Sequence, residues 1–283
     1  REVKTEEELI KVARISTKSE ELGKLIGQMV WELGKYAHIN IEETYGDSIE
    51  TEVVKGINFY GKPMMLYTLN DLKEIDYTGE VGVIITNHEI RDGTDLLRRA
   101  GGDPKDHVIF DLAQQGVKSC VLFAPKIHNE AALTFEKWLK GGFTVIPIKI
   151  PSLTEDQMED IAVYVGATFV NKDRGSQLGQ LIVGDVGKVR RVHLKTDKVS
   201  LYGGNGQPEA IERRHQALVK QLEAEEDELF RKKLERRVSS FSKGVGRIRV
   251  GAETEGRRDY LLKKIEDGVN ATVGALQEGI IRV

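Results

Sequence analysis

Hydrophobic residues near both ends of the chain recur with helical spacing. Thr5 and Glu8 form a capping box that opens a short helix. Ser19 caps a second helix, whose apolar residues recur at every third or fourth position over residues 22–33. The same spacing predicts a final helix over about residues 256–277. Alternating patterns at residues 39–41 and 49–54 predict two strands near the first two helices.

The middle of the chain alternates between short apolar runs and helical patterns. Each expected helix stops at a glycine, which suits the position just past a helix end. Strand–helix alternation with short links indicates an α/β layer with parallel strand pairs. The expected strands are residues 81–85, 119–123, 143–150 and 168–170, and the expected helices are residues 108–115, 130–140 and 154–166. A later pair of segments, about 191–195 and 199–202, is spaced like a hairpin.

Helical ends around an α/β middle indicate an inserted domain, so we expect the two ends to pair in space. The expected boundaries give a first helical segment at 1–54, the inserted domain at 55–244 and a second helical segment at 245–283. A helical run over residues 207–241 carries an acidic stretch, 223–228, followed by a basic one, 231–237. Such a run indicates either a solvated face or a break between two helices.

Composition narrows the function classes. Of the 283 residues 40% are apolar and 31% charged, and the formal net charge of −3 argues against nucleic-acid and membrane-surface partners. No apolar run reaches the roughly 18–20 residues of a membrane span, and no secretory signal is visible. The single cysteine, Cys120, lies in an apolar run and fits a small buried residue in a reducing, cytoplasmic compartment.

Catalytic signatures are missing from the sequence. The six histidines are scattered without metal-ligand spacing, so we expect no metal site, and no nucleophile elbow, Walker A or dinucleotide motif occurs. The glycine-rich segment 203–206 favours a turn over a phosphate loop. This pattern favours a binding function over a free-standing enzyme.

Seven segments, in order along nearly the whole chain, resemble the group I (GroEL-type) chaperonins. They are ISTKSEELGKLI (15–26), INIEE (39–43), EVVKGINF (52–59), IAVYVGAT (161–168), DVGKVRRV (185–192), VGAETE (250–255) and KIEDGVNA (264–271). Residues 71–104 match poorly, so the chain resembles a divergent member. The resemblance covers the family's intermediate and apical domains without its equatorial domain.

This resemblance implies a molecular chaperone that folds proteins with ATP and Mg²⁺ in a full-length ring. The equatorial domain holds the nucleotide in the family, so this fragment alone is expected to bind no cofactor and to be inactive as an enzyme, and it could be monomeric. Asp267 aligns with the family's catalytic aspartate, which positions the water that attacks ATP. The alternative is an ordinary helical ion pair between Asp267 and Lys263.

The family binds non-native polypeptide, and a co-chaperonin, in an apolar groove between two apical helices. By resemblance, residues 130–140 form the first helix and 154–165 the second, with an apolar segment beneath them. The implied binding residues are Met64, Met65, Leu66, Tyr67, Ala131, Thr134, Phe135, Trp138, Tyr164, Phe169 and Val170. The alternative is that these residues are ordinary core.

The chain departs from the family at several of these positions. Lys62 stands where a binding tyrosine is usual, and Thr134 and Glu136 replace apolar residues. Tyr60 stands where an arginine often pairs across subunits with the position of Glu255. Two other functions stay open: an α/β enzyme domain for nucleotides or sugar phosphates, and a small-ligand binding module. An organellar matrix or a virus-infected host cell is also compatible with the sequence.

Overall fold

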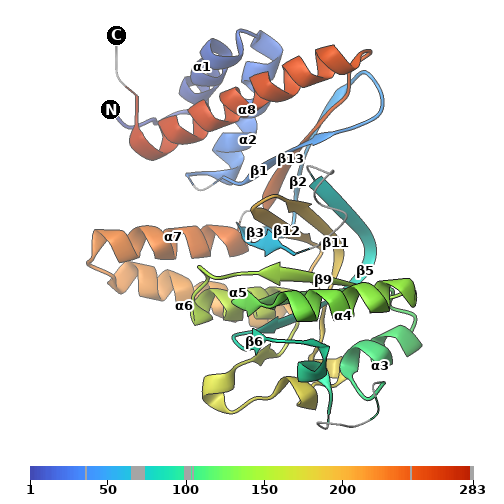
Figure 1. The fold of residues 1–283 in the computed structure, drawn as a ribbon. Coiled ribbons are helices and arrows are strands. Elements are labelled where there is room, and N and C mark those ends of the chain that lie inside the picture. The colour runs from blue at the N-terminus through green and yellow to red at the C-terminus, as the bar shows by residue number, and fades with distance from the viewer. Residues whose placement is uncertain (36, 65–73, 99–102, 104, 243, 281–283) are drawn as a thin grey trace. The chain divides into compact units, whose positions relative to one another are not determined.

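The computed structural model describes residues 1–35, 37–64, 74–98, 103, 105–242 and 244–280. The chain divides into two compact units, Arg1–Lys55 with Gln221–Val283, and Gly56–Lys220 (Figure 1). Arg1 and Ile280 pair through their backbones, the Ile280 N–H lying 2.8 Å from the Arg1 carbonyl oxygen. The predicted α/β fold and the pairing of the two ends are therefore confirmed, while the functional domain boundaries remain a prediction.

Three helices form the core of the first unit. They are α1 (Glu6–Thr17), α2 (Glu20–Leu33) and α8 (Glu255–Glu278), each capped by a Ser or Thr side chain as the sequence suggests for the first two. α1 and α2 cross closely, because a Cβ on Gly27 would lie 2.6 Å from the Ile10 Cα. Leu9, Ile26 and Ile265 are buried where the three helices meet.

A three-stranded sheet interlocks the two ends of the chain. Its order is β1 (Ile39–Glu43), β13 (Val245–Val250) and β2 (Ile49–Val54), with β13 parallel to β1 and antiparallel to β2. The Arg247 guanidinium on β13 reaches both neighbours: Nη2 lies 2.9 Å from Glu42 of β1, and Nη1 lies 2.5 Å from Glu52 of β2. A strand from the second segment thus lies between two from the first.

The second unit is built on one large mixed sheet. Its strand order is β3 (Gly56–Tyr60), β12 (Lys198–Tyr202), β11 (Gly187–Lys195), β5 (Glu74–Thr86), β7 (Ser119–Ala124), β9 (Thr144–Lys149) and β4 (Lys62–Pro63), and β10 (Phe169–Val170) also pairs with β5. β5, β7 and β9 run parallel, and β11 with β12 forms the predicted hairpin. A small parallel pair, β6 (Glu89–Ile90) and β8 (Lys126–Ile127), lies apart from this sheet.

The large sheet closes on itself at Gly61. β3 and β4 stand at opposite ends of the strand order, yet only Gly61 separates them in the chain. One bent strand therefore pairs with β12 through β3 and with β9 through β4. A Cβ on Gly61 would lie 2.8 Å from the Ile148 Cγ2 and 2.9 Å from the Val199 Cγ2, so the closure leaves no room for a side chain.

Helices pack against the parallel strands. Ile84, Cys120, Leu122 and Val145 share one apolar cluster with residues of α3 (Val108–Gln114) and α4 (Asn129–Lys140). Val83, next to Ile84 on β5, pairs with Gly187, and a Cβ on Gly187 would lie 2.5 Å from Val165 Cγ2 of α5 (Glu155–Val165). Because neighbouring strand residues point to opposite faces, Val165 at the end of α5 approaches β5 and β11 on the side of Val83.

The long helical run of the sequence is two helices. α6 (Pro208–Ala224) and α7 (Glu228–Ser242) are separated by three residues within the acidic stretch. Asp227 ends that break, since its Oδ1 accepts hydrogen bonds from the backbone N–H groups of Leu229 and Phe230. The reading of the charge run as a break between helices is confirmed.

We expect Gly61→Ala to lower the free energy of unfolding by about 1–3 kcal/mol, because a methyl group would push against two buried side chains. Urea unfolding followed by circular dichroism measures the change. Gly184→Ala is the matched control, since its Cβ would meet only Ile182 Cδ1 at 3.9 Å and should shift stability by less than about 0.5 kcal/mol. Equal unfolding midpoints for the two variants would contradict the closure argument.

Candidate functional site

A row of aromatic side chains joins α3 to α4. His107, which caps α3, stacks on Trp138 of α4 with ring centroids 4.7 Å apart. Trp138 contacts Phe135 at 5.4 Å, and His107 meets Phe110 of α3 edge-on at 6.5 Å. His107 and Phe135 are buried, while Phe110 and Trp138 are partly exposed. The two helices therefore present an aromatic seam whose outer edges reach solvent.

Several of the implied binding residues gather at this seam. Ala131, Phe135 and Val170 are buried in the apolar cluster beneath α3 and α4, and Met64 and Trp138 pack against it from partly exposed positions. Thr134 is half-buried beside the 3₁₀ turn Gly93–Leu96, where a Cβ on Gly93 would meet its methyl group. Phe135 is only 2% exposed, so the implied binding residues of α4 are divided between the core and the surface.

Two exposed apolar residues of α4 escaped the sequence analysis. Leu133 and Leu139 are 50% and 44% exposed, on a helix whose buried face carries Ala131, Ala132 and Phe135. The sequence did carry a signal for their exposure, because both leucines fall outside the helical stripe that faces the sheet. They supply apolar surface that a partner could cover.

The sequence pairs α4 with α5 as the two walls of one groove, and that pairing stays a prediction. Val165 of α5 approaches the side of β5 that carries Val83, whereas the cluster that contains α4 residues lies on the side of Ile84. α3 is the helix that adjoins α4. Phe169 alternates with Val170 along β10, so it points away from the cluster that contains Val170.

Tyr164 of α5 is covered by the glycine-rich segment. The Gly204 N–H donates to Tyr164 Oη at 3.3 Å, and the Gly206 N–H donates to the Tyr164 carbonyl at 3.0 Å. A Cβ on Gly204 would lie 2.4 Å from that same carbonyl oxygen, so the glycines allow the segment to lie flat on the end of α5. The segment is a structural turn, as predicted, and burial raises the pKa of the Tyr164 phenol.

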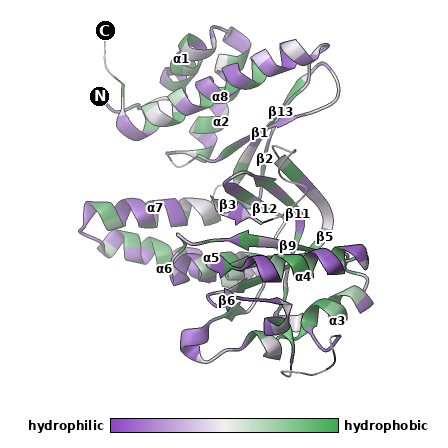
Figure 2. Cartoon of the chain, in the orientation of Figure 1, coloured by the Kyte–Doolittle hydropathy of each residue, from purple (hydrophilic) through white to green (hydrophobic). Residues whose placement is uncertain are grey.

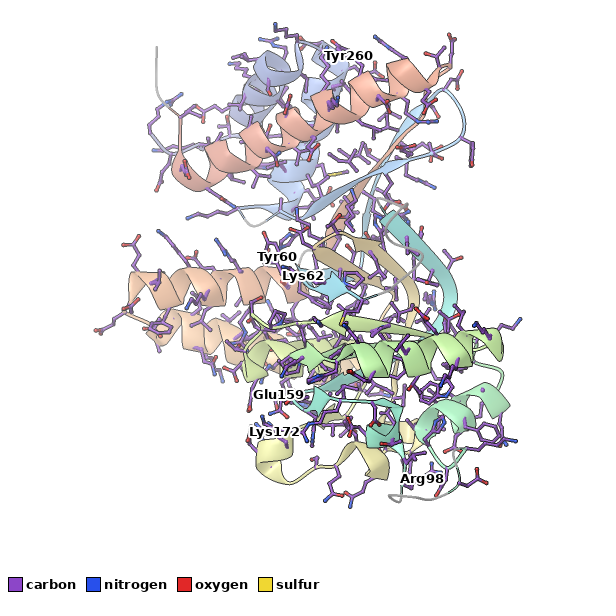
Figure 3. The ribbon with its side chains drawn as sticks, viewed as in Figure 1. Tyr60, Lys62, Arg98, Glu159, Lys172 and Tyr260 are labelled. Carbon is purple, nitrogen blue, oxygen red and sulfur yellow. The ribbon has the colours of Figure 1, made fainter. Side chains whose placement is uncertain are left out.

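The segment expected beneath the groove is described only at its start. Met65, Leu66 and Tyr67 lie outside the described residues. Tyr60 and Lys62, the two departures from the family pattern, flank Gly61 and are both exposed (Figure 3). Met64 follows β4, with its N–H bonded to the Pro147 carbonyl oxygen at 2.8 Å.

An ion cluster fixes the start of α4. His128, the residue before the helix, contacts the Glu89 carboxylate of β6, and Lys126 Nζ lies 2.5 Å from the same oxygen. Hydrogen bonds from Lys126 and then His128 lower the pKa of Glu89 to about 2. The cluster joins β6, β8 and α4 at one point.

A polar cavity of about 280 Å³ lies beside this cluster. Its lining includes His88, Glu89, Asp95, Arg98 and Gln177. The charged groups already have partners: Glu89 binds Lys126 and His128, and Arg98 binds Asp106 at 2.8 Å as well as Asp111. The cavity thus offers a small ligand no unpaired charge at Glu89 or Arg98.

Asp267 lies on α8 in the first unit, with its side chain exposed. Within the part of the chain that the structure describes, no ion pair joins it to Lys263 and no side-chain hydrogen bond engages it. The ordinary helical ion pair considered as its alternative role is therefore not formed. Across the same residues, no cluster of three metal-ligating side chains occurs and no helix is long and apolar enough to cross a membrane.

Comparison with known proteins agrees with this architecture. The chain is 31% identical over 286 aligned residues to the chaperonin GroEL of Acholeplasma laidlawii, an alignment that covers 99% of this chain and 52% of that protein. The fold is similar to a crystal structure of the chaperonin gp146 from bacteriophage EL 2 (Pseudomonas aeruginosa), determined in the presence of ATP-BeFx. That match has a TM-score of 0.71 at 19% identity and covers 99% of this chain and 54% of the phage protein.

The chain is therefore a homologue of the GroEL-type chaperonins, as its sequence motifs indicate. It spans about half the length of the relatives that it matches. No protein-family model matches it.

We expect Glu89→Gln to remove part of the acid sensitivity of the fold. The folded-state pKa of about 2 lies below the ordinary value of 4.5, so the carboxylate's contacts contribute stability above pH 4.5 that is lost as the pH falls toward 2. Unfolding free energies measured between these pH values should fall less steeply for the variant than for the parent. Glu130→Gln, at an exposed carboxylate on α4, should keep the parent slope; equal slopes for all three proteins would refute the assignment.

Proposed function

We propose that the chain is the polypeptide-binding and intermediate part of an ATP-dependent chaperonin. The observation that carries this proposal is homology to a GroEL chaperonin over 99% of the chain. A longer protein containing the chain would supply the nucleotide and Mg²⁺ site and would assemble into a ring, in a cytoplasmic setting. The same homology does not favour the enzyme or small-ligand alternatives.

The surface formed by α3 and α4 is our candidate for binding non-native polypeptide. Leu133, Leu139 and the edges of Phe110 and Trp138 offer apolar area to solvent, above a cluster that keeps the two helices rigid. Covering apolar surface gains about 25 cal/mol per Å² and requires no particular sequence, which suits a site that accepts many unfolded chains. Met64, which follows β4, packs against the same cluster. A co-chaperonin is the other partner that the family resemblance implies here.

We expect the chain to suppress aggregation of a chemically unfolded test protein, and the double variant Leu133→Ser/Leu139→Ser to suppress it less. Each half-exposed leucine contributes about 1–2 kcal/mol of apolar contact, so the affinity for unfolded chains should fall by about tenfold or more. Light scattering of the test protein, at several chain concentrations, measures the effect.

The matched control is Tyr45→Ser, which removes a fully exposed aromatic side chain from the other unit. It should leave suppression unchanged. Because Phe135 is buried, a change there would test folding rather than binding. Equal suppression by the parent and the double leucine variant would refute the α3–α4 surface, and no suppression by the parent would refute polypeptide binding by the chain.

Asp267 is our candidate for the carboxylate that positions water for ATP hydrolysis in the longer protein. Its support is an exposed carboxylate without an intramolecular partner among the described residues, at the position implied by the family motif. We expect Asp267→Ala, in a full-length protein containing this chain, to lower the rate of ATP hydrolysis by about 10²-fold or more while leaving ATP binding intact. Single-turnover hydrolysis and equilibrium nucleotide binding separate the two effects, with Glu266→Ala as the exposed neighbouring control. Unchanged turnover would refute the assignment.

A further inference from the structure

One face of α8 carries cations without carboxylate partners. Arg257, Tyr260 and Lys264 recur at helical spacing, and both cations lie over the Tyr260 ring, at 5.5 Å for Arg257 and 5.0 Å for Lys264. Lys264 Nζ also donates to Tyr260 Oη at 3.0 Å, and Tyr260 is 50% exposed (Figure 3). This hydrogen bond, with the charges of Lys264, Arg257 and Lys18, lowers the pKa of the Tyr260 phenol. We call Lys18, Arg257, Tyr260 and Lys264 the basic face.

The charge of the basic face is not neutralised within the chain. Among the residues that the structure describes, neither Lys18 nor Arg257 nor Lys264 has a carboxylate within ion-pair distance. Lys18 stands at the end of α1, and Ile15, one turn earlier, is largely exposed. Cations around an exposed aromatic ring form a surface suited to an acidic protein segment that also carries apolar groups.

The turn between α6 and α7 has the opposite character. Glu223, Glu225 and Glu226 have no cationic partner among the described residues, and they precede two large exposed side chains. These are Leu229 and Phe230, which are 65% and 54% exposed. None of the described side chains of α7 is buried, and the helix is mostly hydrophilic (Figure 2). We call Glu223, Glu225, Glu226, Leu229 and Phe230 the acidic turn.

Helix α7 exposes its first turns, residues 228–233, to solvent. None of the described side chains of these turns is buried, and the ion pairs Lys232–Glu228 and Arg231–Glu235 add only a few tenths of a kcal/mol each. An external partner that covers Leu229 and Phe230 would stabilise it. The two cations on α8 are separated by seven residues, about 10 Å along the axis, which suits several carboxylates on one protein segment better than a single phosphate.

We propose that the acidic turn of one copy of this chain docks on the basic face of α8 of a second copy. Unpaired cations then meet unpaired carboxylates, and Leu229 with Phe230 covers Tyr260 and Ile15. Among the described residues no ion pair joins the two surfaces within one chain. The contact is head-to-tail, because each copy presents one surface to each neighbour, and repetition of such contacts gives a ring or an open chain of copies. It does not depend on polypeptide binding by α3 and α4.

Sedimentation velocity of the chain over a concentration series tests the contact. We expect association that weakens as salt is added. The reversals Arg257→Glu/Lys264→Glu and Glu223→Lys/Glu225→Lys/Glu226→Lys should each weaken self-association by about tenfold or more. An equimolar mixture of the two variants should associate again. The acidic turn of the first variant then meets the basic face of the second, and the positively charged turn of the second meets the negatively charged α8 face of the first.

Lys137→Glu/Lys140→Glu, at exposed cations of α4, is the matched control and should associate like the parent. Circular dichroism confirms that each variant is folded. Parent-like association of both reversed variants, or a mixture that fails to associate, overturns the proposal. So does a chain that stays monomeric up to about 1 mM. If that monomer binds a labelled poly-glutamate peptide through Arg257 and Lys264, the occupant of the basic face is a different acidic protein and the proposed self-contact is wrong.

Discussion

Strand β13 is the element on which the chain's organisation depends. It comes from the second terminal segment and forms backbone hydrogen bonds with β1 and β2 of the first segment. Arg247 adds a charged link to Glu42 and Glu52, and both Arg247 and Glu42 are largely shielded from water. Removing one partner of a shielded ion pair costs far more free energy than removing one partner of an exposed pair. The two ends are therefore held together firmly. The residues between them can therefore form a separate unit without loosening the ends.

Within that second unit, closure of the sheet at Gly61 plays the corresponding role. A sheet that meets itself has no long exposed edges, and its strands hold their register on both sides. The sheet then supports α3 and α4 through the apolar cluster on its outer face. The consequence for function is that apolar residues on the outer surfaces of α3 and α4 can stay exposed without the helices losing their place, because other residues of these helices already fill the core.

The sequence predicted the regular elements well, because each depends on local information. Thr5, Ser19 and Thr154 cap helices where their side chains can bond to free N–H groups, and buried strands stand out as short apolar runs. The strands β3 and β4 were not predicted, since their pairing depends on residues about 90 to 140 positions away and on a glycine whose neighbours cannot be known from spacing. Long-range closure leaves no local pattern to read.

The candidate site was predicted only in part for a similar reason. Amphipathic spacing shows that α4 has an apolar face, yet it does not show which helix lies beside it. The resemblance pairs α4 with α5, whereas the described aromatic contacts of α4 run to α3 through His107. Leu133 and Leu139 were missed because reasoning from a helical stripe finds the residues that face the core, and these two leucines lie outside that stripe.

The burial of Cys120 has a practical consequence. This thiol, the only one in the chain, is enclosed by the α3–α4 cluster, and burial raises its pKa far above the ordinary value, so it remains an unreactive thiol at neutral pH. A cysteine placed anywhere on the surface would then be the sole site for maleimide dyes or spin labels. Distances between labelled positions in the two units could be followed by fluorescence or electron resonance without first removing a native residue.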